Sequence, residues 1–263
     1  MGGMGAPALI QKRDGGVVTV MLNRPERMNA LHKDLLEQLK KVVDVLETDR
    51  TVRALVITGY GDKAFCAGAD LKERAGMTDK EIVQRLDFVR TLYVRLERLP
   101  FPVIAMINGI ALGGGLELAL ACDLRIVADG ATLALPEVEL AIIPGNGGTQ
   151  RLARLVGRAR ALELLLLAKR LTAADALAIG LVHKVVKAAD LEDVTKEWTD
   201  KLVESGPIAL RQVKVAVRAG MERPLDEALS WEIECYRPCL SSKDRLEGLK
   251  AFSEKRKPKY VGD

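Results

Sequence analysis

The stretch PVIAMINGIALGGGLELALACDLRIVA, residues 102–128, decides the fold class of this chain. An apolar run of strand type leads into three glycines, the glycines lead into an apolar helical segment, and a second strand-type run follows at residues 123–128. Strands that alternate with helices in this way are typical of an α/β layer architecture. The helical segment carries one acid, Glu117, among apolar residues. The role of this acid is the main question that the sequence raises.

The sequence before this stretch continues the alternation. Residues 15–25 (GGVVTVMLNRP) and 52–58 (VRALVIT) are rich in β-branched and apolar side chains and predict strands. Between them, residues 32–49 predict an amphipathic helix, because six apolar side chains recur there at helical spacing. These side chains are Leu35, Leu36, Leu39, Val42, Val43 and Leu46.

The remaining core segments are less regular. Residues 59–71 (GYGDKAFCAGADL) and 133–152 (LALPEVELAIIPGNGGTQRL) predict loops, because neither carries a sustained period. A helix is expected at about residues 79–98, and helices dominate after about residue 147 apart from a short strand within residues 181–186.

The C-terminal part reads as three successive amphipathic helices, in residues 206–220, 224–240 and 242–256. The first has a proline at its first helical position and a glycine expected past its end. Because no strand intervenes, these helices are predicted to cover a face of the core or of a neighbouring subunit. We therefore divide the chain into a core of residues 1–200 and a helical region of residues 201–263.

Composition excludes several classes of protein. Charged residues make up 29% of the 263 residues, and 40 basic residues stand against 36 acids in a dispersed pattern, which does not favour nucleic-acid binding. No apolar run reaches about 18 residues, and the N-terminus lacks the pattern of a targeting peptide, so a cytoplasmic protein is expected. The four cysteines form no CxxC pair and are expected to be reduced.

Three catalytic motifs are disfavoured by their context. GYGDKA, residues 59–64, has the glycine spacing of a dinucleotide fingerprint but no helix opens there, and PGNGGTQR, residues 144–151, lacks the Lys-Ser/Thr pair of a phosphate loop. The latter is interpreted as a tight loop before a helix that can still line a pocket. His32 and His183 have no neighbouring metal ligands and are expected to be structural, so no metal site is predicted.

Glu117 has two interpretations from the residues alone. In the first turn of a helix it can serve as a cap, because free amides and the helix dipole favour negative charge there. Its apolar neighbours, however, indicate a desolvated environment, which moves carboxyl groups toward the range useful for proton transfer. The glycines before it can bring backbone N–H groups close to a ligand oxygen, with a second donor from the loop around residues 65–71. Residue chemistry leaves capping and catalysis open.

Four segments together resemble the enoyl-CoA hydratase, or crotonase, family: AFCAGADLKE, the stretch quoted first, LPEVELAIIPGNGGTQRLARLVG and AADALAIGLVHKVV. The resemblance runs from NRPERMNAL to AFSEKRKPKY, nearly the whole chain. It implies an α/β fold, a crotonase-like spiral of strand-strand-helix turns with a C-terminal helical trimerisation region. It also implies a homotrimer, or a homohexamer made of two trimers.

The resemblance assigns roles to particular residues. The amides of Ala67 and Gly114 would hold the thioester oxygen, and Glu117 and Glu137 would position a water. Glu117 would take the proton of the water that attacks Cβ, and Glu137 would deliver a proton to Cα. Glu139 is expected to be solvated.

Coenzyme A would be part of the substrate, and no separate cofactor is implied. The resemblance places the segment Arg27, Met28 and Ala30 along the ADP portion and the loop Ala67, Gly68, Ala69, Asp70 and Leu71 near the adenine. Further contacts are expected from Gly113, Gly114, Pro136 and Gly145, and from Phe252 and Lys255 toward a neighbouring subunit.

Other activities remain as alternatives. AGADLKERAGM and KDRLEGLKAFSEKRKP look particularly like the methylglutaconyl-CoA hydratase branch, whose carboxylated substrate would need a cation near the acyl tip that the sequence does not reveal. An enoyl-CoA isomerase is a weaker option. RNA binding, found in some members of that branch, is disfavoured because the helix at residues 32–49 mixes lysines with acids.

Overall fold

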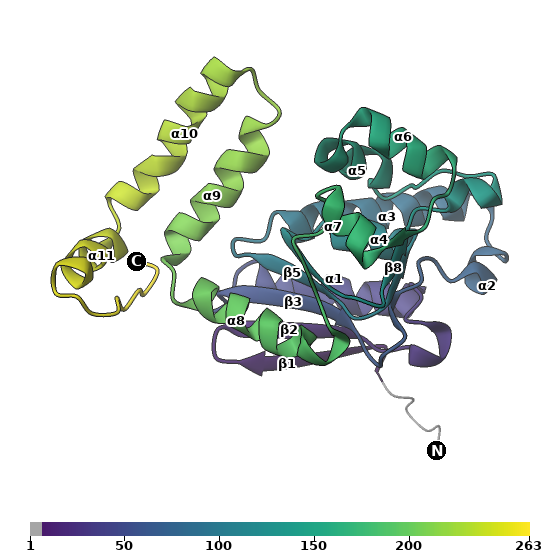
Figure 1. Cartoon of the computed structure of the whole chain (residues 1–263), viewed down its shortest axis with the longest axis horizontal. Helices are drawn as coiled ribbons and strands as arrows, with labels where there is room; N and C mark the ends of the chain where they lie inside the picture. The colour runs from purple at the N-terminus through teal and green to yellow at the C-terminus, as the bar shows by residue number, and fades with distance from the viewer. Residues whose placement is uncertain (1–6) are drawn as a thin grey trace.

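The computed structural model describes residues 7–263, and a six-stranded sheet forms its centre (Figure 1). The strand order is β1-β2-β3-β5-β7-β10, in which β1 and β2 form an antiparallel hairpin and the other neighbours are parallel. The strands are β1 (Leu9–Asp14), β2 (Val17–Leu22), β3 (Ala54–Gly59), β5 (Val103–Ile107), β7 (Leu124–Ala128) and β10 (Lys184–Val186). Strands β3 and β5 are buried along their whole length, which explains their continuous apolar sequence.

A second, smaller sheet has the order β4-β6-β8-β9. Its strands are β4 (Ala64–Cys66), β6 (Ile110–Leu112), β8 (Thr132–Ala134) and β9 (Leu171–Thr172). The chain crosses repeatedly from the large sheet to the small one, β3 to β4, β5 to β6 and β7 to β8, before helices follow. The predicted α/β spiral of strand-strand-helix turns is therefore confirmed.

The strands of the small sheet and β1 were not predicted from the sequence, whereas the predicted short strand within residues 181–186 is β10. A segment of three residues, such as β4 inside the expected loop at residues 59–71, is too short to show a strand period. It becomes a strand because β6 pairs with it in parallel, and β8 pairs with β6 on the other side. The dinucleotide-like glycines 59 and 61 precede this strand and not a helix, as expected.

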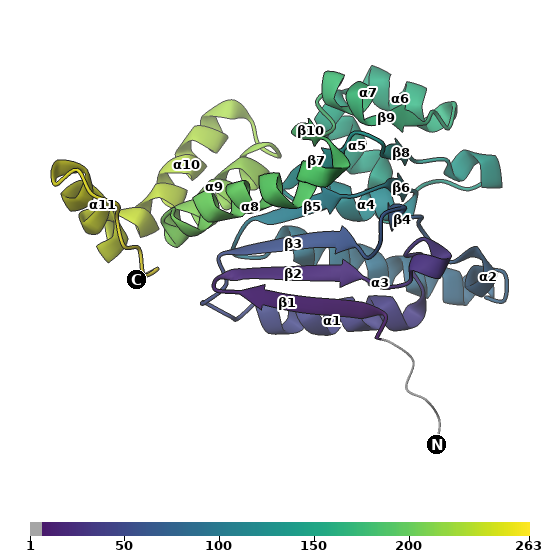
Figure 2. The same cartoon turned by 60° about the horizontal axis from the view of Figure 1, so that its bottom comes forward.

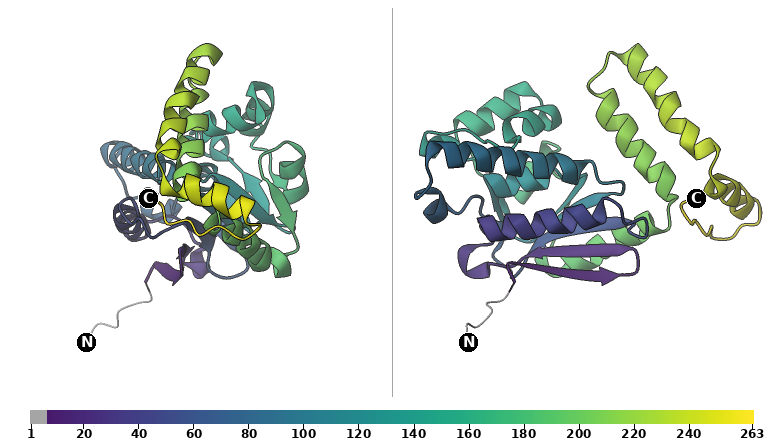
Figure 3. Two further views of the ribbon diagram at one scale, coloured as in Figure 1. Left: turned by 90° about the vertical axis from the view of Figure 1, so that its left-hand side faces the viewer. Right: turned by 180° about the vertical axis from the view of Figure 1, so that it is seen from behind.

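Helices cover both faces of the large sheet (Figures 2 and 3). Helices α1 (Lys33–Leu46) and α3 (Asp79–Glu97) lie on one face, and α8 (Leu191–Val203) lies on the other, where Leu191 packs with Val56 and Ile104. Of the six predicted apolar positions of α1, five are buried and Val42 is partly buried. The other core helices are α2 (Leu71–Arg74), α4 (Gly114–Leu120), α5 (Gly148–Val156), α6 (Arg158–Leu166) and α7 (Ala173–Ala178), with 3₁₀ turns η1 (Pro25–Arg27), η2 (Glu137–Leu140) and η3 (Ala188–Asp190).

The three predicted C-terminal helices are α9 (Pro207–Gly220), α10 (Leu225–Leu240) and α11 (Lys243–Ser253). Helices α9 and α10 form an antiparallel pair that extends away from the core (Figure 1). Gly220 is the last residue of α9 and not the residue past its end. Lys214 ties α9 to the core, because its Nζ lies 2.6 Å from the Asp123 carboxylate and 2.7 Å from the Phe101 carbonyl oxygen.

Candidate active site

The three glycines at the start of α4 bring its backbone against the neighbouring strand and loop. A Cβ atom on Gly115 would lie 2.1 Å from the carbonyl oxygen of Cys66 in β4, so only glycine permits this approach. Gly113 has φ +50° and ψ −126°, a conformation that disfavours other residues. Gly114 is the first residue of α4, and its N–H is therefore free of an intrahelical partner.

The second amide beside Gly114 belongs to Ala69 and not to Ala67. The Ala67 N–H donates to the Met28 carbonyl oxygen at 3.0 Å, so the expectation that it holds a thioester oxygen is wrong. No acceptor for the Ala69 N–H occurs within residues 7–263, and a Cβ atom on Gly114 would lie 3.8 Å from the Ala69 nitrogen. Gly114 and Ala69 thus supply two neighbouring free donors, the requirement for an oxyanion hole.

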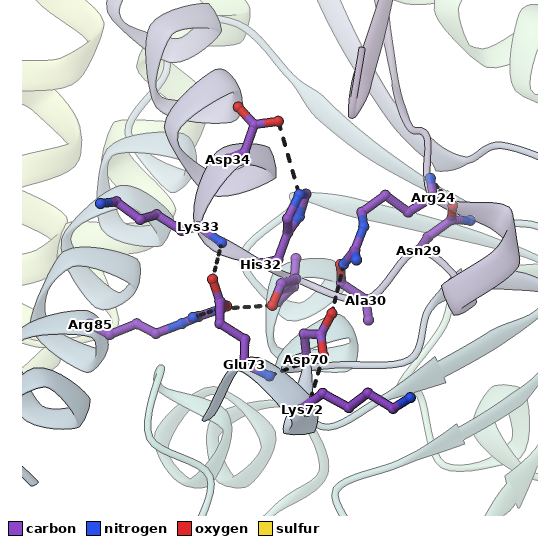
Figure 4. Close-up of polar contacts among 11 residues, drawn as sticks. Arg24, Asn29, Ala30, His32, Lys33, Asp34, Asp70, Lys72, Glu73 and Arg85 are labelled. Carbon is purple, nitrogen blue, oxygen red and sulfur yellow. Dashed lines mark hydrogen bonds and ion pairs between the residues drawn. The ribbon is translucent and has the colours of Figure 1, made fainter. Parts of the chain in front are cut away.

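Hydrogen bonds hold the loop that carries Ala69 in place. The Leu31 N–H donates to Gly68 O at 2.7 Å, and the Asp70 N–H donates to Leu31 O at 2.9 Å. Figure 4 shows how two ion pairs support these contacts: Arg24 lies 3.0 Å from Asp70, and Arg85 pairs with Glu73 while donating to Leu31 O at 2.7 Å. The Asp70 carboxylate also accepts from the first amides of α2. The free Ala69 amide is therefore fixed before a ligand binds.

Glu117 is a cap, but of a helix other than its own. Its side chain is buried, and Oε1 accepts from the N–H groups of Asn146 at 2.7 Å and Gly148 at 2.8 Å. Oε2 accepts from the Asn146 side-chain amide at 2.8 Å. Gly148 is the first residue of α5, so the glycine-rich loop presents its amides to a carboxylate of the protein itself. Three N–H donors therefore surround the Glu117 carboxylate and fix its position.

Glu137 lies in the opposite kind of environment. It is the first residue of η2, directly after Pro136, and its Oε2 is buried with no hydrogen-bond partner in the described part of the chain. Burial raises the pKa of Glu137 to about 7, although a hydrogen bond from its own backbone N–H acts in the opposite direction. The negative charge of Glu117 adds to the rise, and the charge of Arg74 opposes it. A Cβ atom on Gly113 would lie 3.0 Å from Oε1 of Glu137, so this glycine leaves room for the acid.

Both glutamates and both free amides line one cavity of about 470 Å³. Of the residues predicted for the site, this cavity is lined by Arg27, Ala30, Ala67, Gly68, Ala69, Asp70, Leu71, Gly113, Gly114, Glu117, Pro136, Glu137 and Gly145. Glu139 lies at the same cavity, but its side chain is more than half exposed and lies 3.6 Å from Arg170, which agrees with the solvated position expected.

Three predicted contacts lie outside the cavity. Met28 accepts a hydrogen bond from the Ala67 N–H through its carbonyl oxygen, and it does not line the cavity itself. Phe252 is almost fully exposed in the last turn of α11, and Lys255 follows that helix. Helix α11 lies at the opposite end of the molecule from α2 (Figures 1 and 2). Within one chain Phe252 and Lys255 do not reach the site, and their contact with a neighbouring subunit stays a prediction.

The structure adds residues that sequence reasoning missed. Asn146 orients Glu117, and its only sequence signal is that it interrupts a run of glycines. Arg74, Lys72 and Arg85 bring positive charge to the cavity. Apolar side chains complete its wall: Leu36, Met77, Ile82, Leu86, Val89, Leu112, Leu140, Ile142 and Ile143.

Other residue types play structural parts. His183 Nδ1 accepts from the Arg125 N–H at 3.1 Å, and burial lowers the pKa of His183. Three of the four free cysteines are buried. In residues 7–263 no three His, Cys, Asp or Glu side chains cluster as metal ligands would, and none of the helices there is long and apolar enough to cross a membrane.

Comparison with known proteins agrees with this geometry. The family model described as enoyl-CoA hydratase/isomerase matches residues 12–263. The mitochondrial methylglutaconyl-CoA hydratase of Mus musculus is 44% identical, over 97% of this chain and 82% of its own length, and the short-chain-enoyl-CoA hydratase of Clostridium acetobutylicum is 43% identical over 95% of each chain. The crystal structure of an enoyl-CoA hydratase from Bacillus anthracis superposes with a TM-score of 0.96 at 46% identity, over 97% of this chain and 100% of that one. The chain belongs to the enoyl-CoA hydratase/isomerase family.

Proposed function

We propose that this enzyme reversibly adds water across the 2,3-double bond of a 2-enoyl-CoA thioester to give a 3-hydroxyacyl-CoA. The observation that carries the proposal is the pair of glutamates in one cavity. Glu117 is held by three donors, and Oε2 of Glu137 is buried without a hydrogen-bond partner in the described residues. Environments that separate two carboxyl groups in this way suit one to act as base and the other as acid. Hydratases among the relatives of similar length support the same reaction.

In this proposal the reaction starts at the free amides. The N–H groups of Gly114 and Ala69 bind the thioester oxygen and stabilise the negative charge that develops there. Glu117 takes a proton from water as the water oxygen bonds to Cβ, and the electrons of the double bond move toward the thioester oxygen. The protonated Glu137 then gives its proton to Cα. Dehydration is the reverse sequence at the same residues.

The direct test is a hydration assay with crotonyl-CoA. The purified chain should remove the ultraviolet absorbance of the conjugated double bond and form 3-hydroxybutyryl-CoA, identified by mass spectrometry. Formation of a positional isomer without any gain of water would instead favour an isomerase. Retention of both acids in the cavity is the reason to expect hydration.

The coenzyme is assigned to the side of the cavity formed by Arg27, Ala30 and the loop at residues 67–71. Arg27 has the charge to bind a phosphate, and the loop offers backbone groups to the adenine. Coenzyme A enters as part of the substrate, and no further cofactor is proposed. A cytoplasmic location and the absence of nucleic-acid partners remain predictions; the charge of α1 agrees with the latter, because Lys40 lies 2.7 Å from Asp44 and Lys33 lies 3.9 Å from Glu37.

The helical region is proposed to join copies of the chain into a homotrimer or a homohexamer. Helix α10 carries one apolar row at helical spacing with about half or more of each side chain exposed: Leu225, Leu229, Ile233, Tyr236 and Leu240. Such a row is rarely left to water in a soluble protein and favours a partner surface. Assembly would also bring Phe252 and Lys255 toward a neighbour's coenzyme.

A pair of charges in this row should therefore break the assembly. The double variant Leu229→Asp with Ile233→Asp is expected to weaken association by about 3–6 kcal/mol, because two large apolar side chains lose their buried contacts. Light scattering after size exclusion measures the mass of the species. Ser230→Asp, which adds a charge on the same helix beside the row, should keep the wild-type mass. A monomeric wild-type chain would contradict the proposal.

A further inference from the structure

The two amides proposed to bind the thioester oxygen lie on separate segments of the chain. Pairing between β4 and β6 ends at Cys66 and Ala111, before the loop that carries Ala69 and before the start of α4. An oxyanion hole requires both donors to lie about 2.7–3.1 Å from one oxygen, and a displacement of about 1 Å can cost about 100-fold in rate. Contacts beyond this strand pairing therefore have to set the distance between Gly114 and Ala69.

Helix α3 contacts the segment that carries one of these donors. The Arg85 guanidinium donates to Leu31 O at 2.7 Å. Leu31 in turn bonds the loop on both sides of Ala69. Its N–H donates to Gly68 O, and its carbonyl oxygen accepts from the Asp70 N–H. The position of the Ala69 amide is thus linked to α3 through one intervening residue.

The same helix contacts the other donor through Tyr93, a buried group that the proposed reaction does not otherwise use. The Tyr93 side chain is fully buried, and its Oη donates to Gly114 O at 2.9 Å. Burial raises the pKa of Tyr93 well above its ordinary value, so the hydroxyl remains a proton donor. A buried hydroxyl costs free energy unless it is paired, and Gly114 O is the acceptor it has within residues 7–263.

The start of α4 has no side chains that could anchor it, because Gly114 lies between two other glycines. Glycine has more backbone freedom than other residues, so a hydrogen bond to its carbonyl oxygen restricts the orientation of the whole residue, including its N–H. A phenylalanine would fill the same core position as Tyr93. The hydroxyl is therefore explained by its contact with Gly114 and not by packing.

One face of α3 makes both contacts. Arg85, Val89 and Tyr93 recur at helical spacing, and the first two line the active-site cavity. The helix has 19 residues and begins with a capping box, which stabilises its first turn. It can therefore serve as one rigid support behind both amides.

We propose that Tyr93 is a positioning residue of the oxyanion hole. Through the Gly114 carbonyl it holds one amide donor in place relative to the Ala69 donor, which Arg85 of the same helix holds. This inference rests on the proposed hydratase function and adds to it the residues that align the two donors.

The first test is Tyr93→Phe, which removes the hydroxyl and keeps the ring. The kcat for crotonyl-CoA should fall by about 10- to 100-fold, because a misplaced donor stabilises the transition state less, whereas KM should stay within a few-fold of the wild type. Bound para-dimethylaminocinnamoyl-CoA reports on the thioester carbonyl itself, since hydrogen bonds to the carbonyl oxygen move its absorption to longer wavelength. This shift should be smaller in Tyr93→Phe than in the wild type.

Thr58→Val is the matched control. Thr58 is also buried and its Oγ1 donates to Met106 O at 2.8 Å, but it does not line the active-site cavity. This variant should lower Tm as Tyr93→Phe does, yet keep the wild-type kcat and absorption shift. Arg85→Gln loosens the other donor and should lower both kcat and the shift, and Arg85→Lys should recover part of each.

Wild-type kcat and absorption shift in Tyr93→Phe would overturn the inference. So would a fall in kcat that accompanies a lower Tm while the shift keeps its wild-type size, because Tyr93 would then support only the fold. If Tyr93→Phe does not fold, Arg85→Gln decides by the same two measurements. A wild type that shifts the absorption of the bound ester but does not hydrate crotonyl-CoA would contradict the hydratase function alone, which is a distinct outcome.

Discussion

Glu117→Gln should lower kcat for the hydration of crotonyl-CoA by about 10²- to 10⁴-fold, the usual contribution of a general base. Glutamine has the shape of glutamate but cannot take the proton of the attacking water. Its amide oxygen can still accept from the Asn146 and Gly148 N–H groups, and the Asn146 side chain can rotate to present its oxygen to the new amide group. The fold and the cavity should therefore survive the change.

A measurement of substrate binding distinguishes the loss of the general base from damage to the folded site. Crotonyl-CoA affinity, measured by isothermal titration calorimetry, should stay within a few-fold of the wild type, because the Gly114 and Ala69 amides are untouched. Glu139→Gln is a suitable comparison, since that side chain lies at the same cavity but is largely exposed. Turnover by Glu117→Gln at the wild-type rate would eliminate Glu117 as the base.

Glu137→Gln should reduce hydration by a similar order, about 10²- to 10⁴-fold, because the amide cannot donate a proton to Cα. The Glu137→Gln variant should still bind the thioester and activate water through Glu117. Exchange of substrate hydrogens with deuterated water reports on the Cα step and should disappear in this variant. If exchange at Cα continued at the wild-type rate, another group would have to be the acid.

The pH dependence of the wild type follows from the same acid. Burial raises the pKa of Glu137 to about 7, and hydration needs its protonated form, so kcat/KM should fall as pH rises through about 7. In Glu137→Gln the residual kcat/KM should not show this fall with rising pH. A wild-type profile that stays flat from pH 6 to about pH 8 would contradict the assignment of Glu137 as the acid.

Stability should change with pH in the same direction. The pKa of Glu137 in the folded chain lies above its ordinary value of 4.5, so the folded state binds this proton more tightly than the unfolded state. Its stabilising contribution is complete below about 4.5 and is lost as pH rises through about 7. The difference in Tm between Glu137→Gln and the wild type should accordingly shift in favour of the variant as the pH rises through this range.

Local sequence was sufficient for much of the fold because the information is periodic or compositional. The helical spacing of apolar residues in α1 predicts that one face of this helix is buried. The continuous apolar runs of β3 and β5 predict strands that are buried on both faces. The short strands β4, β6 and β8 have no such pattern, and pairing between distant segments creates them. Their existence is a tertiary property.

The site shows the same division. Residue types and the family resemblance identified Glu117, Glu137 and Gly114, and these side chains and amides do line one cavity. The sequence could not tell whether the amide of Ala67 or that of Ala69 is free to bind a ligand oxygen. The difference is that a carbonyl oxygen of the protein accepts a hydrogen bond from the Ala67 N–H and none accepts from the Ala69 N–H within residues 7–263. That carbonyl, Met28 O, comes from a segment almost forty residues earlier.

By itself, then, the sequence determined that this chain alternates strands and helices, belongs with a family of thioester enzymes and carries two acids for their chemistry. Only the tertiary structure decided that Glu117 accepts hydrogen bonds from the amides of Asn146 and Gly148, whereas Oε2 of Glu137 is buried without a hydrogen-bond partner in the described residues. The tertiary structure also places Arg74 at the cavity, on the four-residue helix α2, which is too short to be predicted from the sequence pattern. The physical reason is that charge state and donor availability depend on neighbours distant in sequence, which no local pattern encodes.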